Sequence, residues 1–192
     1  MPLVRTSVPV WEPVWKTGAV IDADGGRLLV VVRHARAEDH GPTDFERTLT
    51  PTGREDATEA GRWLADEGFV PDHAIVSAAV RARETWEALA AGAGWTVPPE
   101  LDRGMYAAEP DTVLDLVGLV DDAVERLVVL GHNPTVGYLA HLLDDGLAGP
   151  ETADGLLSGF PTSAVAVFRW KRSWRDLKVG AARLVATHVG RA

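Results

Sequence analysis

The chain has 192 residues and a mass of 20.6 kDa, which is enough for one well-packed domain and short for two. Its 46% hydrophobic and 24% charged residues argue against a disordered, collagen-like or coiled-coil chain. A net charge of -9 argues against a surface that coats nucleic acid or an anionic membrane, and the absence of cysteine excludes disulfides, a thiolate nucleophile and cysteine-ligated metal sites.

The N-terminal stretch differs in its residue pattern from the rest of the chain. Residues 1–27 contain three prolines and an Asp-Gly-Gly turn signal with no helical period, which predicts an irregular arm with one short strand at 19–21. This stretch lacks the apolar core of a signal peptide, and no run of about 18 uncharged apolar residues follows it. We therefore expect a cytoplasmic protein without membrane or nucleic-acid partners, whose folded domain spans residues 28–192. The sequence gives no oligomeric state.

The first half of the predicted domain alternates strands with helices. Residues 28–32 form a continuous apolar run without polar alternation, as in a strand buried on both faces. Thr50 and Pro51 are typical of the start of a helix, and Gly68 is typical of its end, which predicts a helix to about residue 67. A second short strand at 74–76 is followed by a segment rich in helix formers at 79–91.

The second half repeats the pattern. The spacing of apolar residues predicts a helix over 110–120, and 127–130 predicts another buried strand. Asn133 and Pro134 suit the N-cap and first position of a further helix. Residues 164–168 and 182–187 predict two late strands. The alternation indicates a three-layer α/β/α sandwich with a mostly parallel central sheet.

Polar residues follow the carboxyl ends of three predicted strands, where open α/β sheets bind ligands. These residues are Arg33-His34, then Ser77 leading to Arg81, and Gly131-His132-Asn133. Guanidinium groups bind phosphate oxygens through paired hydrogen bonds, and a neutral imidazole can attack phosphorus while a second, protonated imidazole steadies the transferring group. The helix that begins near Asn133 adds unpaired N–H groups and a positive dipole end.

These segments together resemble the histidine phosphatase superfamily, in the branch with an RHG-type signature and a phosphoglycerate mutase-like fold. The resemblance rests on Val32-Arg33-His34-Ala35, Ser77 to Thr85, and Gly131-His132-Asn133-Pro134. The loop from Asp44 to Thr50 and the segment from Phe160 to Ala164 resemble the SixA-type phosphohistidine phosphatases more narrowly. The match runs in the right order over about 28–168, so 28–192 is expected to be a histidine phosphatase domain.

The resemblance implies a role for each site residue. His34 would be the nucleophile that accepts the phosphoryl group, Arg33 and Arg81 would bind its oxygens, and His132 with Asn133 would complete the substrate pocket. The resemblance implies no metal and no cofactor, and the sequence shows no compact cluster of metal ligands. Ala35 replaces the glycine that usually follows the nucleophile, a small change that a tight turn accepts unless φ must be positive.

The sequence assigns no general acid for the leaving group. The candidate carboxylates are Glu38, Glu100, Asp102 and Glu109. A phosphoramidate leaving group needs less help than an alcohol, so a missing acid would suit phosphohistidine. The expected substrate is a phosphorylated protein or a small phosphorylated molecule. The alternatives are a phosphomonoesterase for sugar phosphates or nucleotides, and a phosphate-binding module that has lost turnover.

Several other polar residues are expected to be structural. The remaining histidines, which lack a comparable context, are His40, His73, His141 and His188. Arg47 is expected to pair with Asp44 or Glu46, and Ser77 to cap the helix that follows it.

Overall fold

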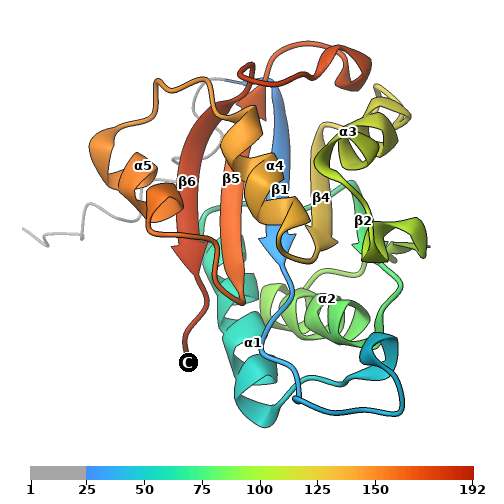
Figure 1. The fold of residues 1–192 in the computed structure, drawn as a ribbon. Helices are drawn as coiled ribbons and strands as arrows, with labels where there is room; N and C mark the ends of the chain where they lie inside the picture. Colours follow the sequence, from blue (N-terminus) through green and yellow to red (C-terminus); the bar gives the residue numbers. More distant parts are fainter. Residues whose placement is uncertain (1–24) are drawn as a thin grey trace, which may run out of the picture.

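The centre of the computed structural model, which describes residues 25–192, is a six-stranded sheet with the strand order β3-β2-β4-β1-β5-β6 (Figure 1). The strands are β1 (Arg27–Arg33), β2 (His73–Ser77), β3 (Glu100–Asp102), β4 (Arg126–Gly131), β5 (Ala164–Trp170) and β6 (Arg183–Val189). β3, β2, β4 and β1 are parallel, whereas β5 is antiparallel to both β1 and β6. The predicted, mostly parallel sheet is therefore confirmed. The arm expected over 1–27, including its strand at 19–21, lies outside the described residues up to residue 24.

Helices cover both faces of this sheet. They are α1 (Pro51–Asp66), α2 (Val80–Ala93), α3 (Pro110–Gly118), α4 (Thr135–Leu143) and α5 (Pro150–Leu157). Because side chains alternate along a strand, Val30 and Val31 of β1 face opposite layers. Val30 packs in one core cluster with Leu64 of α1 and Leu89 of α2, whereas Val31 packs in the other with Leu139 of α4. Figure 1 shows α4 lying across one face of the sheet, which completes the predicted three layers.

Local signals placed most element boundaries correctly. Thr50 caps α1 by accepting a hydrogen bond from the Gly53 N–H at 3.0 Å, and Gly68 adopts a φ of 76° just beyond the helix. Among the strands and α-helices of residues 25–192, two were not predicted, the edge strand β3 and the helix α5. β3 has three residues, too few for a periodic signal.

The predicted start of α4 needs a correction. Pro134, and not Asn133, is the N-cap, and the Asn133–Pro134 peptide bond is cis. Asn133 still serves the helix, because its Oδ1 accepts a hydrogen bond from the Gly137 N–H at 3.2 Å. The helix therefore begins one residue later than an Asn cap would place it, with the Asn133 side chain reaching over its first turn.

The close approach of α1 and α2 depends on glycine, and we expect Gly61→Ala to destabilise the fold. A Cβ at position 61 would lie 2.0 Å from the backbone oxygen of Leu89. Separating the two helices should lower the free energy of unfolding by about 1–3 kcal/mol. Chemical denaturation checks this, with Gly118→Ala as the matched control, because a Cβ there would meet only ordinary contact with Arg175 at 3.7 Å. Equal midpoints for the two variants would contradict the prediction.

Candidate active site

Two buried histidines meet at the carboxyl edge of the parallel strands. His34 follows β1 and His132 follows β4, and these strands are neighbours in register, with Arg33 opposite Gly131. The backbone N–H of His34 donates to the Gly131 carbonyl at 3.0 Å, and the two imidazole centroids lie 4.9 Å apart. The side chains that were 98 positions apart in the sequence are therefore in contact, as expected from the strand ends.

The surroundings of His34 fix its ring in one tautomer. Its Nδ1 lies 2.7 Å from the backbone oxygen of Ala35, which can only accept a hydrogen bond, so Nδ1 carries the proton and Nε2 keeps its lone pair. Burial, with the positive charges of Arg81, Arg33 and Arg47, lowers the pKa of His34 to about 4, although the hydrogen bond to the Ala35 carbonyl acts in the opposite direction. At neutral pH His34 is thus an uncharged imidazole with a free nucleophilic nitrogen.

The turn after His34 accommodates Ala35 in place of glycine. Among residues 25–192, Ser163 is the non-glycine residue with a positive φ, so Ala35 has an ordinary backbone conformation. The Ala35 N–H donates to Thr85 Oγ1 at 3.0 Å, and this hydroxyl donates to the Arg81 carbonyl at 2.6 Å. Thr85 therefore ties the nucleophile's turn to the first turns of α2, which carries Arg81.

His132 is also neutral in the free protein. Burial is the main cause that lowers its pKa to about 3; a proton on His34 and the charge of Arg81 act in the same direction, while Asp44 opposes them. The sequence assigned a protonated second imidazole to the step in which the phosphoryl group is transferred, and that role stays a prediction. Because the ring is buried beside cations, a proton on His132 becomes favourable only when an anion approaches.

Ser77, at the end of β2, positions His132. Its Oγ lies 2.8 Å from His132 Nε2 and accepts a weaker hydrogen bond from the Ala79 N–H at 3.4 Å. When the hydroxyl donates its proton to Nε2, the ring proton of His132 lies on Nδ1. The predicted capping role of Ser77 is replaced by this contact, since Ala79 is the N-cap of α2.

We expect Ser77→Ala to lower kcat/KM about tenfold while the protein stays folded. The change leaves a buried imidazole nitrogen without its partner, and loss of such a hydrogen bond costs on the order of 1–2 kcal/mol. Steady-state kinetics with a circular dichroism control measures the effect. Ser158→Ala, which removes an exposed hydroxyl on the surface, should leave the rate unchanged. Equal rates for the two variants would show that Ser77 does not position His132.

The two predicted arginines, Arg33 and Arg81, each have a buried N–H group without a hydrogen-bond partner in residues 25–192. Arg33 Nη1 donates to the Phe160 carbonyl at 2.9 Å, and Arg81 Nη1 donates to the Asp44 carbonyl at 2.6 Å. Within residues 25–192, the Nε atoms of Arg33 and Arg81 and Nδ1 of His132 are buried without a hydrogen-bond partner. A bound oxyanion is the kind of ligand that satisfies several such N–H groups together.

Asn133 has partners inside the protein. Its amide nitrogen donates to the Phe160 carbonyl at 2.8 Å, which is the same oxygen that accepts from Arg33. Its amide oxygen accepts from the Gly137 N–H. Asn133 therefore holds the acceptor that orients Arg33, and its direct contact with substrate stays a prediction.

Asp44 is the carboxylate of the site that the sequence did not single out. Its Oδ2 lies 3.1 Å from Arg81 Nη2 and accepts a hydrogen bond from the Tyr106 hydroxyl, while Oδ1 pairs with Arg47 at 2.8 Å. The Tyr106 hydroxyl, followed by Arg81 and Arg47, lowers the pKa of Asp44 to about 2. The Arg47 pair was predicted, but the contact with Arg81, 37 positions away, has no local signal in the sequence.

The four candidate acids have other partners or face solvent. Asp102 Oδ1 accepts from the Met105 N–H at 2.9 Å, and Glu100 pairs with His73 at 3.1 Å. Glu38 and Glu109 are exposed or partly exposed side chains of loops. In the described part of the chain, no hydrogen bond or ion pair joins any of the four to His34 or His132.

The other four histidines lie outside this site, as expected. His188 stacks on Trp63 with centroids 4.6 Å apart and pairs with Glu59, whereas His40 and His141 are exposed. Residues 25–192 contain no group of three or more metal-ligating side chains. In the same range, no helix combines the length and apolarity that crossing a bilayer requires.

Comparison with known proteins agrees with this geometry. The model of the histidine phosphatase superfamily (branch 1) matches residues 29–106. The uncharacterized protein Rv1276c of Mycobacterium tuberculosis is 37% identical over 163 residues, which cover 83% of this chain and 100% of the relative. Phosphohistidine phosphatase SixA of Escherichia coli is 28% identical over 172 residues, which cover 80% of this chain and 98% of the relative.

The solved structure of the putative phosphohistidine phosphatase SixA from Nakamurella multipartitia superimposes with a TM-score of 0.77 at 30% identity, covering 88% of this chain and 98% of that one. The shared fold and the paired histidines at the strand ends agree with the motifs of the sequence. The chain therefore belongs to the histidine phosphatase superfamily, branch 1, and is a phosphatase of the SixA type.

Proposed function

We propose that this phosphatase hydrolyses phosphohistidine, or a similar small phosphorylated group, through a covalent intermediate on His34 and without a metal ion. The observation that carries the proposal is the state of His34. Its Nδ1 is held by the Ala35 carbonyl, its pKa is about 4, and the cations of Arg81 and Arg33 lie close enough to lower that pKa. An imidazole in this state attacks phosphorus at neutral pH without first losing a proton.

The reaction has two displacement steps. In the first, His34 Nε2 forms a bond to phosphorus while the bond from phosphorus to the leaving nitrogen breaks, and that nitrogen takes a proton from solvent. In the second, water attacks the phosphoryl group, the bond to His34 Nε2 breaks, and the water's proton leaves with bulk solvent. His34 is then restored and inorganic phosphate is released.

The arginines and His132 have an electrostatic role in both steps. The charge of the transferring group spreads over its equatorial oxygens, where fixed N–H donors stabilise it best. We assign this role to the guanidinium groups of Arg33 and Arg81 and to His132 Nδ1, which has no hydrogen-bond partner in residues 25–192. Approach of the anion also raises the pKa of His132, so this imidazole can become a cationic donor during the reaction.

The ionised state of Asp44 favours a phosphoramidate over an alcohol ester as the substrate. A pKa of about 2 keeps Asp44 ionised at neutral pH, so it has no proton to give to a leaving oxygen. An imidazole leaving group is far less basic than an alkoxide and takes its proton from water. The name of the related Escherichia coli protein, a phosphohistidine phosphatase, supports the same substrate class. We place the activity in residues 28–192.

A covalent trapping experiment tests the proposal. The protein is mixed with a peptide that carries labelled phosphohistidine, and the reaction is stopped after milliseconds in denaturant at alkaline pH. We expect label that is stable to alkali and released by acid on the wild-type protein, and none on His34→Ala. Label that persists on His34→Ala would overturn the assignment of the nucleophile.

A substrate panel tests the choice of leaving group. Turnover of the phosphohistidine peptide is compared with turnover of sugar phosphates and nucleotides under the same conditions. We expect the peptide to have the highest kcat/KM by at least about tenfold, for want of a general acid. A faster sugar phosphate or nucleotide would make the protein a phosphomonoesterase, and tight binding of phosphate without any hydrolysis would make it a binding module.

A further inference from the structure

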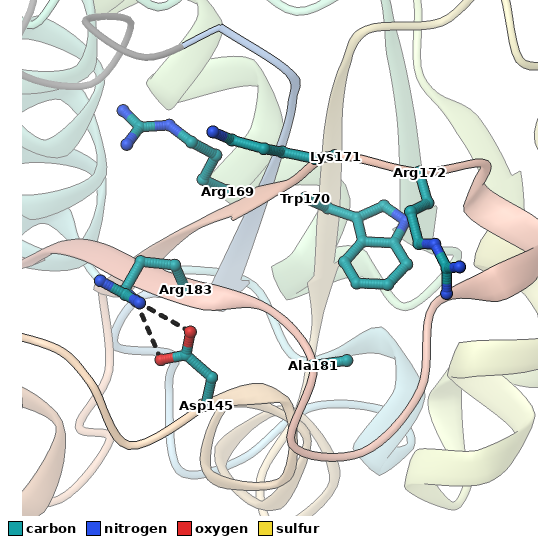
Figure 2. Close-up of a pocket in the computed structure, with 7 residues that line it drawn as sticks. All are labelled: Asp145, Arg169, Trp170, Lys171, Arg172, Ala181 and Arg183. Carbon is teal, nitrogen blue, oxygen red and sulfur yellow. Dashed lines mark hydrogen bonds and ion pairs between the residues drawn. The ribbon is translucent and has the colours of Figure 1, made fainter.

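A cationic cavity lies at the opposite end of the sheet from His34 (Figure 2). It has a volume of about 330 Å³, and its walls include Asp145, Arg169, Trp170, Lys171, Arg172 and Arg183. β5 begins beside the active site, where the Ser163 N–H donates to the His34 carbonyl, and ends at Trp170. With a rise of about 3.3 Å per residue, the cavity lies roughly 20 Å from the catalytic edge. The proposed phosphatase reaction does not use it.

Positive charge is concentrated in the segment that forms this cavity. Residues 169–183 contain six lysine or arginine residues and one acidic residue, although the whole chain has a net charge of -9. Solubility alone does not account for such segregation, because the rest of the surface already carries an excess of negative charge. The segment follows the part of the sequence that resembles the family motifs.

Two cations of the cavity, Lys171 and Arg172, have no acidic partner among residues 25–192. Asp145 is occupied by Arg183, whose Nε lies 3.0 Å and 2.8 Å from its two carboxylate oxygens. The side chains of Lys171 and Arg172 make no hydrogen bond or ion pair with any other residue in 25–192. Figure 2 shows these two side chains on either side of the Trp170 indole. An anion in the cavity would therefore meet a net positive charge from both sides.

Hydrogen bonds fix the walls of the cavity in place. Trp170 Nε1 donates to the Ser173 carbonyl at 2.8 Å, and Arg27 Nη1 donates to the Arg172 carbonyl at 2.9 Å. The Asp145 N–H donates to the Ala182 carbonyl at 3.0 Å, which ties the loop of Asp145 to the start of β6. Such a pre-formed site has little ordering cost on binding.

We propose that this cavity binds a phosphorylated small molecule with two or more anionic groups, of about the size of a nucleoside diphosphate. The cavity, with about 330 Å³, is larger than one phosphate ion requires, and Lys171 and Arg172 lie on different sides of Trp170. A ligand with separated negative charges can therefore contact both cations. Arginine and lysine are the residues that bind phosphate oxygens, and Trp170 between them offers an apolar wall to the organic part of the ligand.

Calorimetric titration of the full chain with ADP tests the proposal. Binding to the active site is weakened beforehand by Arg81→Gln, so that the remaining heat reports the distal cavity. We expect one molecule of ADP per chain, and affinity at least about tenfold lower when Lys171→Ser and Arg172→Ser are added, since two charge-assisted contacts are lost. Hydrolysis of the phosphohistidine peptide should stay unchanged in Lys171→Ser/Arg172→Ser with Arg81 intact.

A matched double variant separates the cavity from general surface charge. Arg175→Ser/Lys178→Ser removes the same number of charges from exposed positions of the same segment that do not line the cavity, and should keep ADP affinity within about threefold. Inorganic diphosphate should also bind, and adenosine should not. Absence of binding by both ADP and diphosphate, equal binding of adenosine, or equal losses in the two double variants would each overturn the proposal.

Discussion

Replacement of His34 by asparagine should lower kcat by at least about 10³-fold, because the amide cannot attack phosphorus. The asparagine side chain places its amide nitrogen near the position of imidazole Nδ1. Its N–H can therefore still donate to the Ala35 carbonyl, which lies 2.7 Å from Nδ1 in the wild type. The variant thus removes the nucleophile with little change to the turn. Single-turnover and steady-state kinetics on the phosphohistidine peptide measure the loss.

His141→Asn is the matched control for this variant. His141 lies exposed on α4 beside a hollow that Asn133 also lines, and within residues 25–192 no hydrogen bond, ion pair or ring contact joins it to His34 or His132, so the same substitution there removes an imidazole that neither histidine contacts. We expect its kcat to equal that of the wild type, and both variants to give the wild-type circular dichroism spectrum. A His34→Asn protein that keeps more than about a tenth of the wild-type rate would show that another residue accepts the phosphoryl group.

The stability of the protein should fall steeply in mild acid because of the same two histidines. The pKa of His34 is about 4 and that of His132 about 3, both below the ordinary value of 6.5 that they regain on unfolding. Between these pKa values and 6.5, the two imidazoles are protonated in the unfolded chain but not in the folded one. Stability is therefore highest above pH 6.5 and is lost as the pH falls below it. Each histidine should remove about 2 kcal/mol from the free energy of unfolding between about pH 8 and about pH 5.

Urea denaturation at a series of pH values checks this linkage. The double variant His34→Asn/His132→Asn should show a flatter pH profile than the wild type, because the groups that titrate only on unfolding are gone. Replacing the exposed pair His40→Asn/His141→Asn should leave the slope unchanged. A wild-type profile as flat as that of the His34/His132 variant would show that these imidazoles are protonated in the folded protein.

The local sequence was sufficient for most of the fold. A continuous apolar run marks a strand buried on both faces, so β1 and β4 could be located from their runs of apolar residues alone. Thr50 and Gly68 mark the ends of α1 because a cap and a left-handed glycine act within a few residues of the chain. Signals of this kind are absent at β3, an edge strand of three residues, and the sequence therefore missed it.

The sequence also predicted which residues share the site, through the topology of the sheet. Parallel neighbouring strands bring their carboxyl ends to one edge, so residues that follow β1 and β4 had to be close. What it could not give was the partner of each side chain. Ser77 contacts His132, which lies 55 positions away in the sequence. Asp44 pairs with Arg81, which lies 37 positions away.

The layer architecture, the family and the set of four catalytic candidates could thus be predicted from the chain alone, because they depend on local periodicity and on short motifs. The chemical state of those candidates follows from the three-dimensional packing and could not be predicted in advance. Burial and the field of nearby arginines depend on everything packed around a group, and they are what make both imidazoles neutral. The same holds for the distal cavity, because its cations come from β5, from the segment after β5 and from β6, and only the packed fold places them around one cavity.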